Sequence, residues 1–225
     1  MLENSGHTIL LEVGAGAGNT AFPILACNKN PNLKLHACDF SKTAVELIRK
    51  NDAYDPKYIQ ADVWDVAGES LPPGLSEASV DVVLMIFVFS ALSPLQWRQA
   101  VHNINRVLKP GGEVLFRDYG RGDLAQVRFK KGRYLEENFY VRGDGTRVYF
   151  FDKDELIDIW RGIACQSDSE SNSVASYQGA FFEVIDIGVD RRLLVNRAKQ
   201  LKMYRCWIQG RFRKRDISTV HHGDK

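Results

Sequence analysis

The sequence lacks the features that mark membrane, secreted and zinc-binding proteins. None of its apolar runs approaches the roughly 20 residues of a membrane-spanning helix, and no basic flank followed by an apolar run marks a signal peptide. Its four cysteines have no C-x-x-C spacing, which argues against a zinc site and a disulfide framework. These absences predict a cytoplasmic protein with no metal and no membrane anchor; a mitochondrial location is the alternative.

Acidic residues are missing from one long stretch. Residues 191–215 include ten Lys or Arg and no Asp or Glu, although the whole chain has a formal net charge of only +2. The remainder therefore carries a net charge of −8. A basic segment on an acidic body is typical of a protein with a polyanionic partner. The interleaved Tyr204, Trp207 and Phe212 favour a structured binding surface over a solvated basic face.

A glycine-rich turn follows the first apolar run, in the stretch ILLEVGAGAGNT at residues 9–20. Glycines let a backbone approach a ligand closely, and the helix that follows presents unpaired N–H groups. The third glycine comes one position earlier than in the dinucleotide-binding spacing G-x-G-x-x-G. With Glu12 ahead of it, the turn resembles that of S-adenosylmethionine (SAM) methyltransferases. We expect SAM contacts at Glu12, Gly14 and Gly16; another nucleotide site or a plain tight turn is the alternative.

Strand and helix patterns alternate through the first half of the chain, which predicts a parallel sheet flanked by helices. We expect strands at residues 8–13, 33–39, 57–62, 80–87 and 113–119, and helices at 19–28, 41–51 and 94–108. Residues 120–151 are too long for an ordinary connection, and a central Gly-Asp-Gly predicts a β-hairpin there. We then expect a helix at 152–163, a polar loop at 166–178, strands at 181–189 and 202–209, and a flexible tail at 213–225.

Carboxylates follow two of the expected strands. Ligands of open α/β sheets bind beyond the carboxyl ends of the strands, so these side chains are expected to share one crevice. Asp39 ends the second strand, where it can accept both ribose hydroxyls of an adenosine, or else cap the next helix. Asp62 ends the third strand, and we expect it to accept the adenine amino group, with Asp65 as the competing candidate.

Three further residues complete the expected cofactor site. The backbone of Val63, next to Asp62, would complete the contacts to the base edge. Ile86 and Phe87 end the fourth strand and would form an apolar wall beside the cofactor, with ordinary core packing as the alternative. The four strand ends agree in placing one binding edge, which is stronger evidence than any of them alone.

The motifs of the second half resemble those of a known family. The segments are 117–121 (RDYGR), 128–132 (RFKKG), 138–147 (NFYVRGDGTR) and 190–197 (DRRLLVNR), together with 86–91 (IFVFSA). They are similar to the methyltransferase-like enzymes that make 3-methylcytidine in the anticodon loop of tRNA. Residues 199–205 resemble the members that act on threonine tRNAs more than those that act on serine tRNAs.

The resemblance implies a fold and a reaction. The fold is a single Rossmann-like class I SAM-dependent methyltransferase domain over residues 1–225, with a mostly parallel seven-stranded sheet and an antiparallel last strand. A β-hairpin insertion at 120–151 is implied to serve RNA. The expected reaction transfers a methyl group from SAM to N3 of cytidine 32, leaving S-adenosylhomocysteine, and the same SAM contacts are implied at Gly14, Asp39, Asp62, Val63 and Ile86.

Catalytic and RNA-binding residues are expected on the same basis. We expect Asp118 to contact the cytosine amino group or the developing positive charge, with Tyr119 or Phe87 lining the pocket; a structural Asp118 paired with Arg117 or Arg121 is the alternative. Phosphate contacts use Lys and Arg. The expected ones are Arg121, Arg128, Lys130, Lys131, Arg133, Arg191, Arg192 and Arg197, some of which are expected to form internal ion pairs.

One departure from the family stands out. Members carry an N-terminal helical segment that closes over SAM, whereas only seven residues precede the first expected strand here. Weak SAM binding and low activity are expected for the chain as given. The alternatives to a tRNA enzyme are a small-molecule methyltransferase and a non-catalytic RNA-binding scaffold. A helper protein is a further possible partner.

Overall fold

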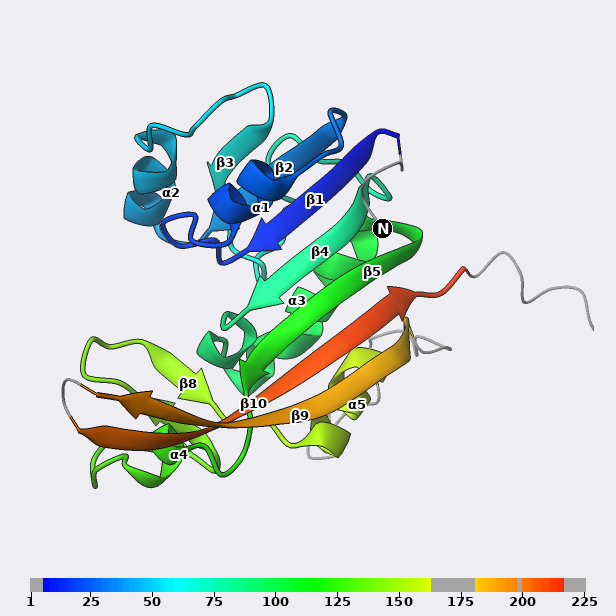
Figure 1. Ribbon diagram of the computed structural model, residues 1–225. Coiled ribbons are helices and arrows are strands. Elements are labelled where there is room, and N and C mark those ends of the chain that lie inside the picture. Colours follow the sequence, from blue (N-terminus) through cyan, green and yellow to red (C-terminus); the bar gives the residue numbers. More distant parts are fainter. Residues whose placement is uncertain (1–5, 163–180, 198–199, 217–225) are drawn as a thin grey trace, which may run out of the picture.

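A seven-stranded sheet forms the centre of the molecule (Figure 1). The computed structural model describes residues 6–162, 181–197 and 200–216, so the expected polar loop at 166–178 lies outside the described residues. The strand order is β3-β2-β1-β4-β5-β10-β9, and β10 runs antiparallel to the other six strands of this sheet. The strands are β1 (Thr8–Val13), β2 (Leu33–Asp39), β3 (Ile59–Val63), β4 (Val80–Ile86), β5 (Leu108–Tyr119), β9 (Phe182–Asn196) and β10 (Leu201–Lys214).

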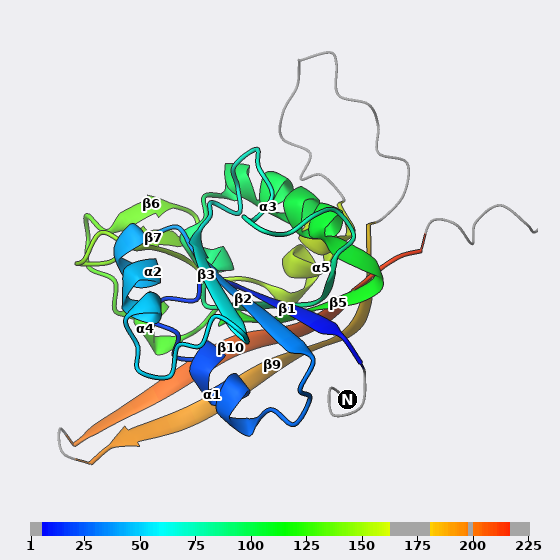
Figure 2. The same cartoon turned by 90° about the horizontal axis from the view of Figure 1, so that it is seen from above.

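Helices cover both faces of the sheet (Figure 2). Alternate residues of a strand point to opposite faces, and in β1 Leu10 joins one hydrophobic cluster while Leu11 and Val13 join the other. The first cluster includes α1 (Ala21–Cys27) and α2 (Lys42–Arg49). The second lies under α3 (Pro94–Val107), α5 (Lys153–Arg161) and the short 3-10 helix η1 (Phe89–Ala91).

Local capping signals explain where several helices begin. The side chain of Ser41 accepts a hydrogen bond from the N–H of Ala44 at the start of α2. Ser93 with Gln96, and Asp152 with Glu155, form capping boxes at the starts of α3 and α5. These caps satisfy N–H groups that have no partner inside the helix, and they agree with the helix starts predicted from the sequence.

The last two strands are longer than predicted and form an arm. Their pairing continues past Tyr119, the end of β5, which lies opposite Trp207. Register partners run from Trp207 with Asp190 to Leu201 with Asn196. We call residues 190–197 and 200–207 the arm, which projects beyond the sheet (Figures 1 and 2). At its other end β10 continues through Lys214, into the stretch expected as a flexible tail.

The insertion after β5 contains the predicted hairpin and one strand more. Its elements are α4 (Leu124–Val127), β6 (Tyr134–Glu136), β7 (Phe139–Val141) and β8 (Arg147–Tyr149). The three strands form a separate antiparallel sheet in the order β6-β7-β8. A bridge between Gly120 and Phe151 joins the two ends of the insertion. Among the described residues, no helix has the length and apolar character needed to cross a membrane.

Candidate cofactor and nucleobase site

The glycine turn lies at the carboxyl edge of the sheet. Gly14 and Gly16 have φ values of 70° and 56°, which non-glycine residues rarely adopt. The N–H of Gly14 donates to the carbonyl of Cys38 at 2.8 Å, so the turn crosses the end of β2. A Cβ on Gly14 would lie 2.5 Å from the side chain of Val88, whereas a Cβ on Gly16 would meet nothing within 4 Å. Gly14 is therefore required for packing, and Gly16 faces open space.

Glu12 places a buried carboxyl group under this turn. It is 3% exposed, and burial raises its pKa to about 7. Thr20 and the backbone of Ala21 face the carboxyl group, but its Oε2 atom has no hydrogen-bond partner among the described residues. An unpartnered buried carboxylate oxygen is costly, and a cationic ligand would offset that cost. Glu12 therefore fits a cationic ligand such as SAM, and its contact with SAM stays a prediction.

Asp39 ties the turn to the end of β2. Its Oδ2 accepts from the N–H of Gly16 and its Oδ1 from the N–H of Ser41, both at 2.8 Å. Next to it, Phe40 is 75% exposed, and Val63, the register partner of Asp39, is 47% exposed. Two exposed apolar side chains at this edge suit the faces of an adenine ring. Phe40 was not among the predicted site residues. The signal available in the sequence was an aromatic residue directly after Asp39.

Asp62 is engaged within the protein. Arg49 Nη2 lies 2.9 Å from its Oδ1, and Gln60 Nε2 donates to its Oδ2 at 2.8 Å. The neighbouring Asp65 accepts from the N–H of Ala67. An adenine amino group would therefore have to share the Asp62 carboxylate with Arg49 and Gln60, and the adenine contact stays a prediction.

Asp118 is fully buried. Its Oδ2 accepts from the N–H of Ser90 at 2.9 Å and its Oδ1 from the N–H of Tyr119 at 2.8 Å. Burial raises its pKa to about 6. It pairs with neither of the predicted cations, because Arg117 binds Asp190 and Arg121 binds Glu155. In this structure Asp118 joins η1 to the end of β5, and the predicted direct contact with a base stays a prediction.

An aromatic cluster occupies the edge beside Asp118. Phe87 has a φ of 56°, and its ring lies 4.9 Å from that of Tyr119 and 6.0 Å from that of Trp207. Arg117 and Arg205 lie over the Trp207 ring at 4.6 and 5.2 Å. Trp207 was not among the predicted site residues, because its place depends on the register of β10 against β5. Flat rings at the end of the sheet suit a nucleobase.

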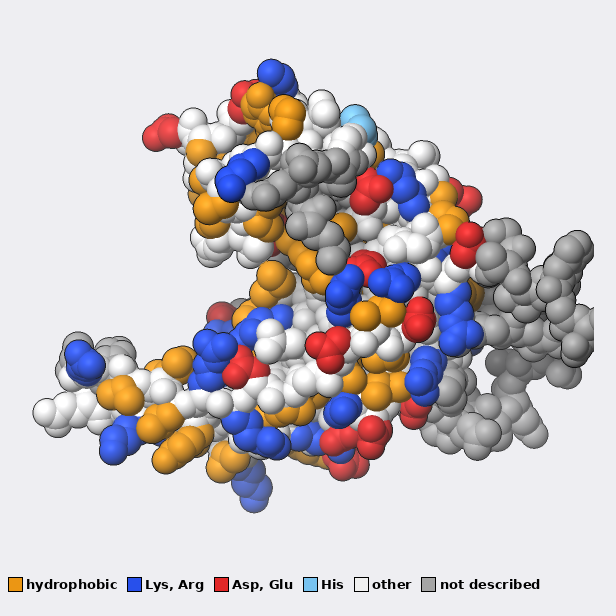
Figure 3. All heavy atoms as spheres, turned by 45° about the vertical axis from the view of Figure 1, so that its right-hand side comes forward, with side chains coloured by type: hydrophobic (Ala, Val, Ile, Leu, Met, Phe, Trp, Pro, Cys, Tyr) orange, Lys and Arg blue, Asp and Glu red, His pale blue; other side chains and the backbone are white. Residues whose placement is uncertain are grey.

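Only some of the predicted RNA-binding cations are free. Arg121 pairs with Glu155, and Arg192 pairs with Asp190. The other six predicted contacts are exposed and form no ion pair within the described ranges: Arg128, Lys130, Lys131, Arg133, Arg191 and Arg197. The surface is hollowed between the arm and the part that carries β1 to β3, with Lys and Arg along the arm (Figure 3).

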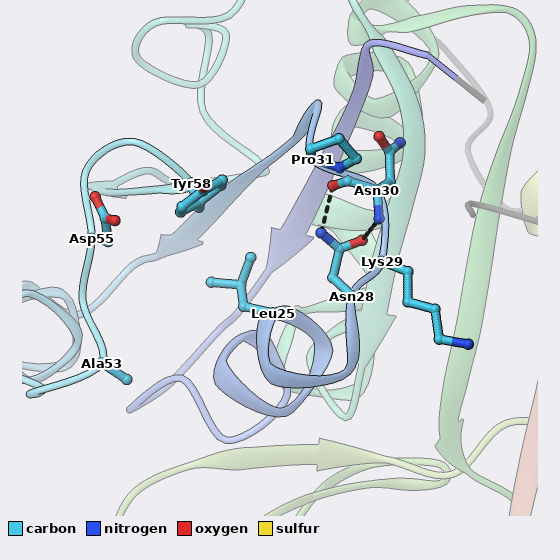
Figure 4. Close-up of a pocket in the computed structure, with 8 residues that line it drawn as sticks. All are labelled: Leu25, Asn28, Lys29, Asn30, Pro31, Ala53, Asp55 and Tyr58. Carbon is cyan, nitrogen blue, oxygen red and sulfur yellow. Dashed lines mark hydrogen bonds between the residues drawn. The ribbon is translucent and has the colours of Figure 1, made fainter. Parts of the chain in front are cut away.

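A cavity of about 310 Å³ lies at the other end of the sheet (Figure 4). Leu25, Pro31 and Tyr58 line it together with two asparagines. The side-chain amide of Asn28 donates to the carbonyl of Asn30 and accepts from the N–H of Asn30, as the dashed lines show. The side-chain amide of Asn30 bonds Gly6, Thr8 and Asn32 instead, so both side-chain amides have partners among the described residues. Within the described residues no cluster of His, Cys, Asp or Glu is arranged to hold a metal ion.

Comparison with known proteins agrees with this geometry. A family model described as a methyltransferase domain matches residues 11–114. The chain is 51% identical over 212 residues to the tRNA N(3)-methylcytidine methyltransferase of Schizosaccharomyces pombe, covering 94% of this chain and 63% of that protein. It is 53% identical over 205 residues to the tRNA(Thr) (cytosine(32)-N(3))-methyltransferase of Saccharomyces cerevisiae, covering 90% of this chain and 30% of that protein.

The solved structures support the fold. A SAM-dependent methyltransferase from Methanosarcina mazei superposes with a TM-score of 0.64 at 15% identity, covering 95% of each chain. The predicted Rossmann-like methyltransferase fold and the predicted family resemblance are both confirmed. The chain spans less than two thirds of the length of the curated relatives described above.

Proposed function

We propose that this chain, which is homologous over nearly its whole length to the tRNA N3-cytidine methyltransferases, transfers a methyl group from SAM to N3 of cytidine 32 in the tRNA anticodon loop. Threonine tRNA is the favoured substrate, since the printed name of the Saccharomyces cerevisiae relative specifies it. One observation carries the proposal. The buried Glu12 carboxyl group, whose Oε2 has no hydrogen-bond partner among the described residues, lies at the same carboxyl edge as the aromatic cluster of Phe87, Tyr119 and Trp207.

The chain's own residues are suited to holding SAM, which when bound supplies an electrophilic methyl group on a sulfonium. Glu12 would face the cationic methionine end and Gly14 and Gly16 would admit it. Asp39 would accept the ribose hydroxyls. Exposed Phe40, on the same edge, would flank the adenine.

The target base sets modest chemical demands. Neutral cytosine carries a lone pair on N3, so no strong general base is needed to make it a nucleophile. The protein's tasks are to hold the base in line, exclude water and stabilise positive charge as it develops. N3 lies on the pairing edge, so the base must leave its stack to react. Phe87 and Tyr119 are proposed to hold its faces.

Asp118 is proposed to act by positioning these rings. Its two oxygens hold the N–H groups of Ser90 and Tyr119, so it fixes both the end of β5 and the start of η1. A carboxylate this close to the base site also favours positive charge nearby. Loss of Asp118 is therefore expected to lower the turnover number more than it weakens SAM binding.

RNA contacts are proposed for the free cations. Arg128, Lys130, Lys131 and Arg133 are exposed on the insertion, and Arg191 and Arg197 are exposed on the arm. We assign Arg121 and Arg192 to ion pairs with Glu155 and Asp190 instead. Phosphate contacts release counterions, so substrate affinity should fall steeply with salt. A small-molecule methyltransferase would not show that dependence.

Mass spectrometry of nucleosides tests the reaction. Threonine tRNA would be incubated with SAM and protein, alongside a matched transcript with uridine at position 32. We expect 3-methylcytidine only in the first, and strongly reduced formation with Asp118→Ala. Methylation of a free metabolite, or RNA binding without any methylation, would overturn the proposal in favour of one of the two alternatives.

A further inference from the structure

A continuous series of ring contacts leads from the target-base site into the insertion. The ring of Phe87 lies 4.9 Å from that of Tyr119, which lies 5.7 Å from Phe150. Phe150 lies 5.8 Å from Tyr140, and Tyr140 lies 5.9 Å from Tyr134. Four contacts therefore connect the end of β4 with β6, the outermost strand of the small sheet.

The rings of this series are buried in the middle and exposed at both ends. Phe150 in the middle is fully buried, whereas Phe87 is 37% exposed and Tyr134 is 61% exposed. Phe129 stacks on Tyr140 at 4.7 Å with an interplanar angle of 16°, which fixes the ring that supports Tyr134. The Tyr134 hydroxyl donates no hydrogen bond to any described residue. The series thus has a rigid buried centre and two exposed ends.

Free positive charge surrounds the distal end. Arg128, Lys130, Lys131 and Arg133 are all exposed, and they lie on either side of Phe129 and directly before Tyr134 in the sequence. None of them forms an ion pair with a residue that the structure describes. Cations interleaved with exposed aromatic rings are the combination that binds single-stranded nucleic acid, because phosphates and base faces are recognised together.

We propose that Tyr134, supported by Tyr140 and Phe129, is a second stacking site, which takes an unpaired base of the same RNA loop that supplies the target cytidine. This inference rests on the proposed function for its RNA substrate. The four ring-to-ring steps together span at most about 22 Å, and stacked nucleotides advance roughly 3.4 Å apiece, so a single-stranded loop of about seven nucleotides reaches both ends. The second site would hold the loop open while Phe87 and Tyr119 receive the target base.

Fluorescence of 2-aminopurine tests this directly. Anticodon stem-loop RNAs would carry it at each loop position in turn, except the target position. We expect quenching at one loop position several nucleotides from the target with the unmutated protein and with Tyr134→Phe, which keeps the ring. Tyr134→Leu keeps apolar bulk without an aromatic face, and it should lose the quenching and weaken RNA affinity roughly 5- to 150-fold.

Two controls make the result decisive. Leu95→Ala, which removes an 88% exposed apolar side chain from α3, should leave quenching and affinity unchanged. The rate of 3-methylcytidine formation at saturating RNA should stay within about two-fold in Tyr134→Leu, since stacking of a second base on Tyr134 acts mainly on RNA binding. Retained quenching and an unchanged dissociation constant in Tyr134→Leu would overturn the second site. Position-specific quenching without any methylation would instead leave the second site standing and refute the proposed function.

Discussion

The half of the sheet that holds the glycine turn and the half that carries the arm are built in different ways. In the first half the site depends on residues close in the sequence: Glu12, the turn and the end of β2, joined by the hydrogen bond from Gly16 to Asp39. In the second half the site depends on contacts between distant segments. Arg205 of the arm binds Asp123 of the insertion, 82 positions earlier in the chain.

Charge also behaves differently in the two halves. Glu12 is a buried carboxyl group whose Oε2 has no hydrogen-bond partner among the described residues, so the first half presents one buried acidic group to a ligand. In the second half much of the positive charge is neutralised internally. The ion pairs within the basic stretch join Arg192 to Asp190, Arg205 to Asp123, and both Arg211 and Arg213 to Glu113. Net charge alone therefore overstates how many cations are available to RNA.

The largest expected effect is that of Asp123→Ala, which tests whether the two halves act separately. This carboxylate has no exposed surface, and it accepts hydrogen bonds from Arg205 Nε at 2.9 Å and from the N–H of Cys206 at 2.8 Å. Asp123→Ala would leave Arg205 unpaired and partly buried, so we expect a loss of about 3–5 kcal/mol in unfolding free energy. RNA affinity should fall, while the SAM dissociation constant should change less than two-fold in calorimetry.

An exposed aspartate provides the control for that change. Asp158→Ala on α5 removes an exposed carboxylate that forms no hydrogen bond or ion pair with a described residue, and it should alter unfolding free energy by less than about 0.5 kcal/mol. Equal losses of SAM and RNA affinity in Asp123→Ala would show that the halves do not act separately.

Most of the sheet was predictable because its signals are local. Apolar runs and capping residues such as Ser41 and Asp152 gave strand and helix positions close to those observed. The third strand of the insertion, β6, was missed because all three of its residues are exposed, so no alternation of apolar and polar residues marks it. The arm was predicted too short because Arg191 and Arg192 interrupt the apolar pattern, although cross-strand pairing continues through them.

More of the candidate site could be predicted from the sequence in the first half than in the second. Glu12, Gly14 and Asp39 meet in the structure as expected, because a strand, a turn and the neighbouring parallel strand determine their positions. Trp207 could not be assigned, since only the register of β10 against β5 places it opposite Tyr119. The alternative of an Asp118 paired with Arg117 or Arg121 is not observed, because these arginines bind Asp190 and Glu155, which lie far away in the sequence.

The pH dependence of Glu12→Gln tests the first half. The folded protein holds the Glu12 proton up to a pKa of about 7, above the ordinary value of 4.5. The folded state therefore binds more protons than the unfolded state between these values, and wild-type stability falls as pH rises through that window. Relative to wild type, urea unfolding of Glu12→Gln should show a gain of up to about 3 kcal/mol at pH 8 and little change near pH 4.5.

Cofactor binding should respond in the opposite sense. The charged carboxylate attracts a cation, so SAM affinity of the wild type should rise between pH 6 and pH 8 relative to that of Glu12→Gln. S-adenosylhomocysteine lacks the sulfonium charge and serves as the matched ligand, with a weaker dependence. Identical pH profiles for the two proteins would remove Glu12 from the cofactor site.

Salt dependence tests which cations of the second half meet phosphate. Replacing Arg128, Lys130 and Lys131 together with Gln should reduce the slope of log affinity against log salt by about 2, since each single-strand phosphate contact contributes roughly 0.7. Arg211→Gln with Arg213→Gln is the matched variant, because both cations bind Glu113. It should leave the slope unchanged. A fall in slope for the matched variant alone would place the RNA path on the sheet rather than on the insertion.

The smallest expected effect concerns two neighbours on the arm. Arg191 forms no ion pair with a described residue, whereas Arg192 Nε lies 2.9 Å from Asp190. Arg191→Gln should lower the salt slope by roughly 0.7, and Arg192→Gln by less than half of that, because Asp190, which also binds Arg117, already holds the Arg192 guanidinium. Fluorescence anisotropy across a salt series resolves this difference. Equal slopes would mean that RNA displaces Asp190, in which case the internal pair is a reserve of positive charge rather than a fixed support of the arm.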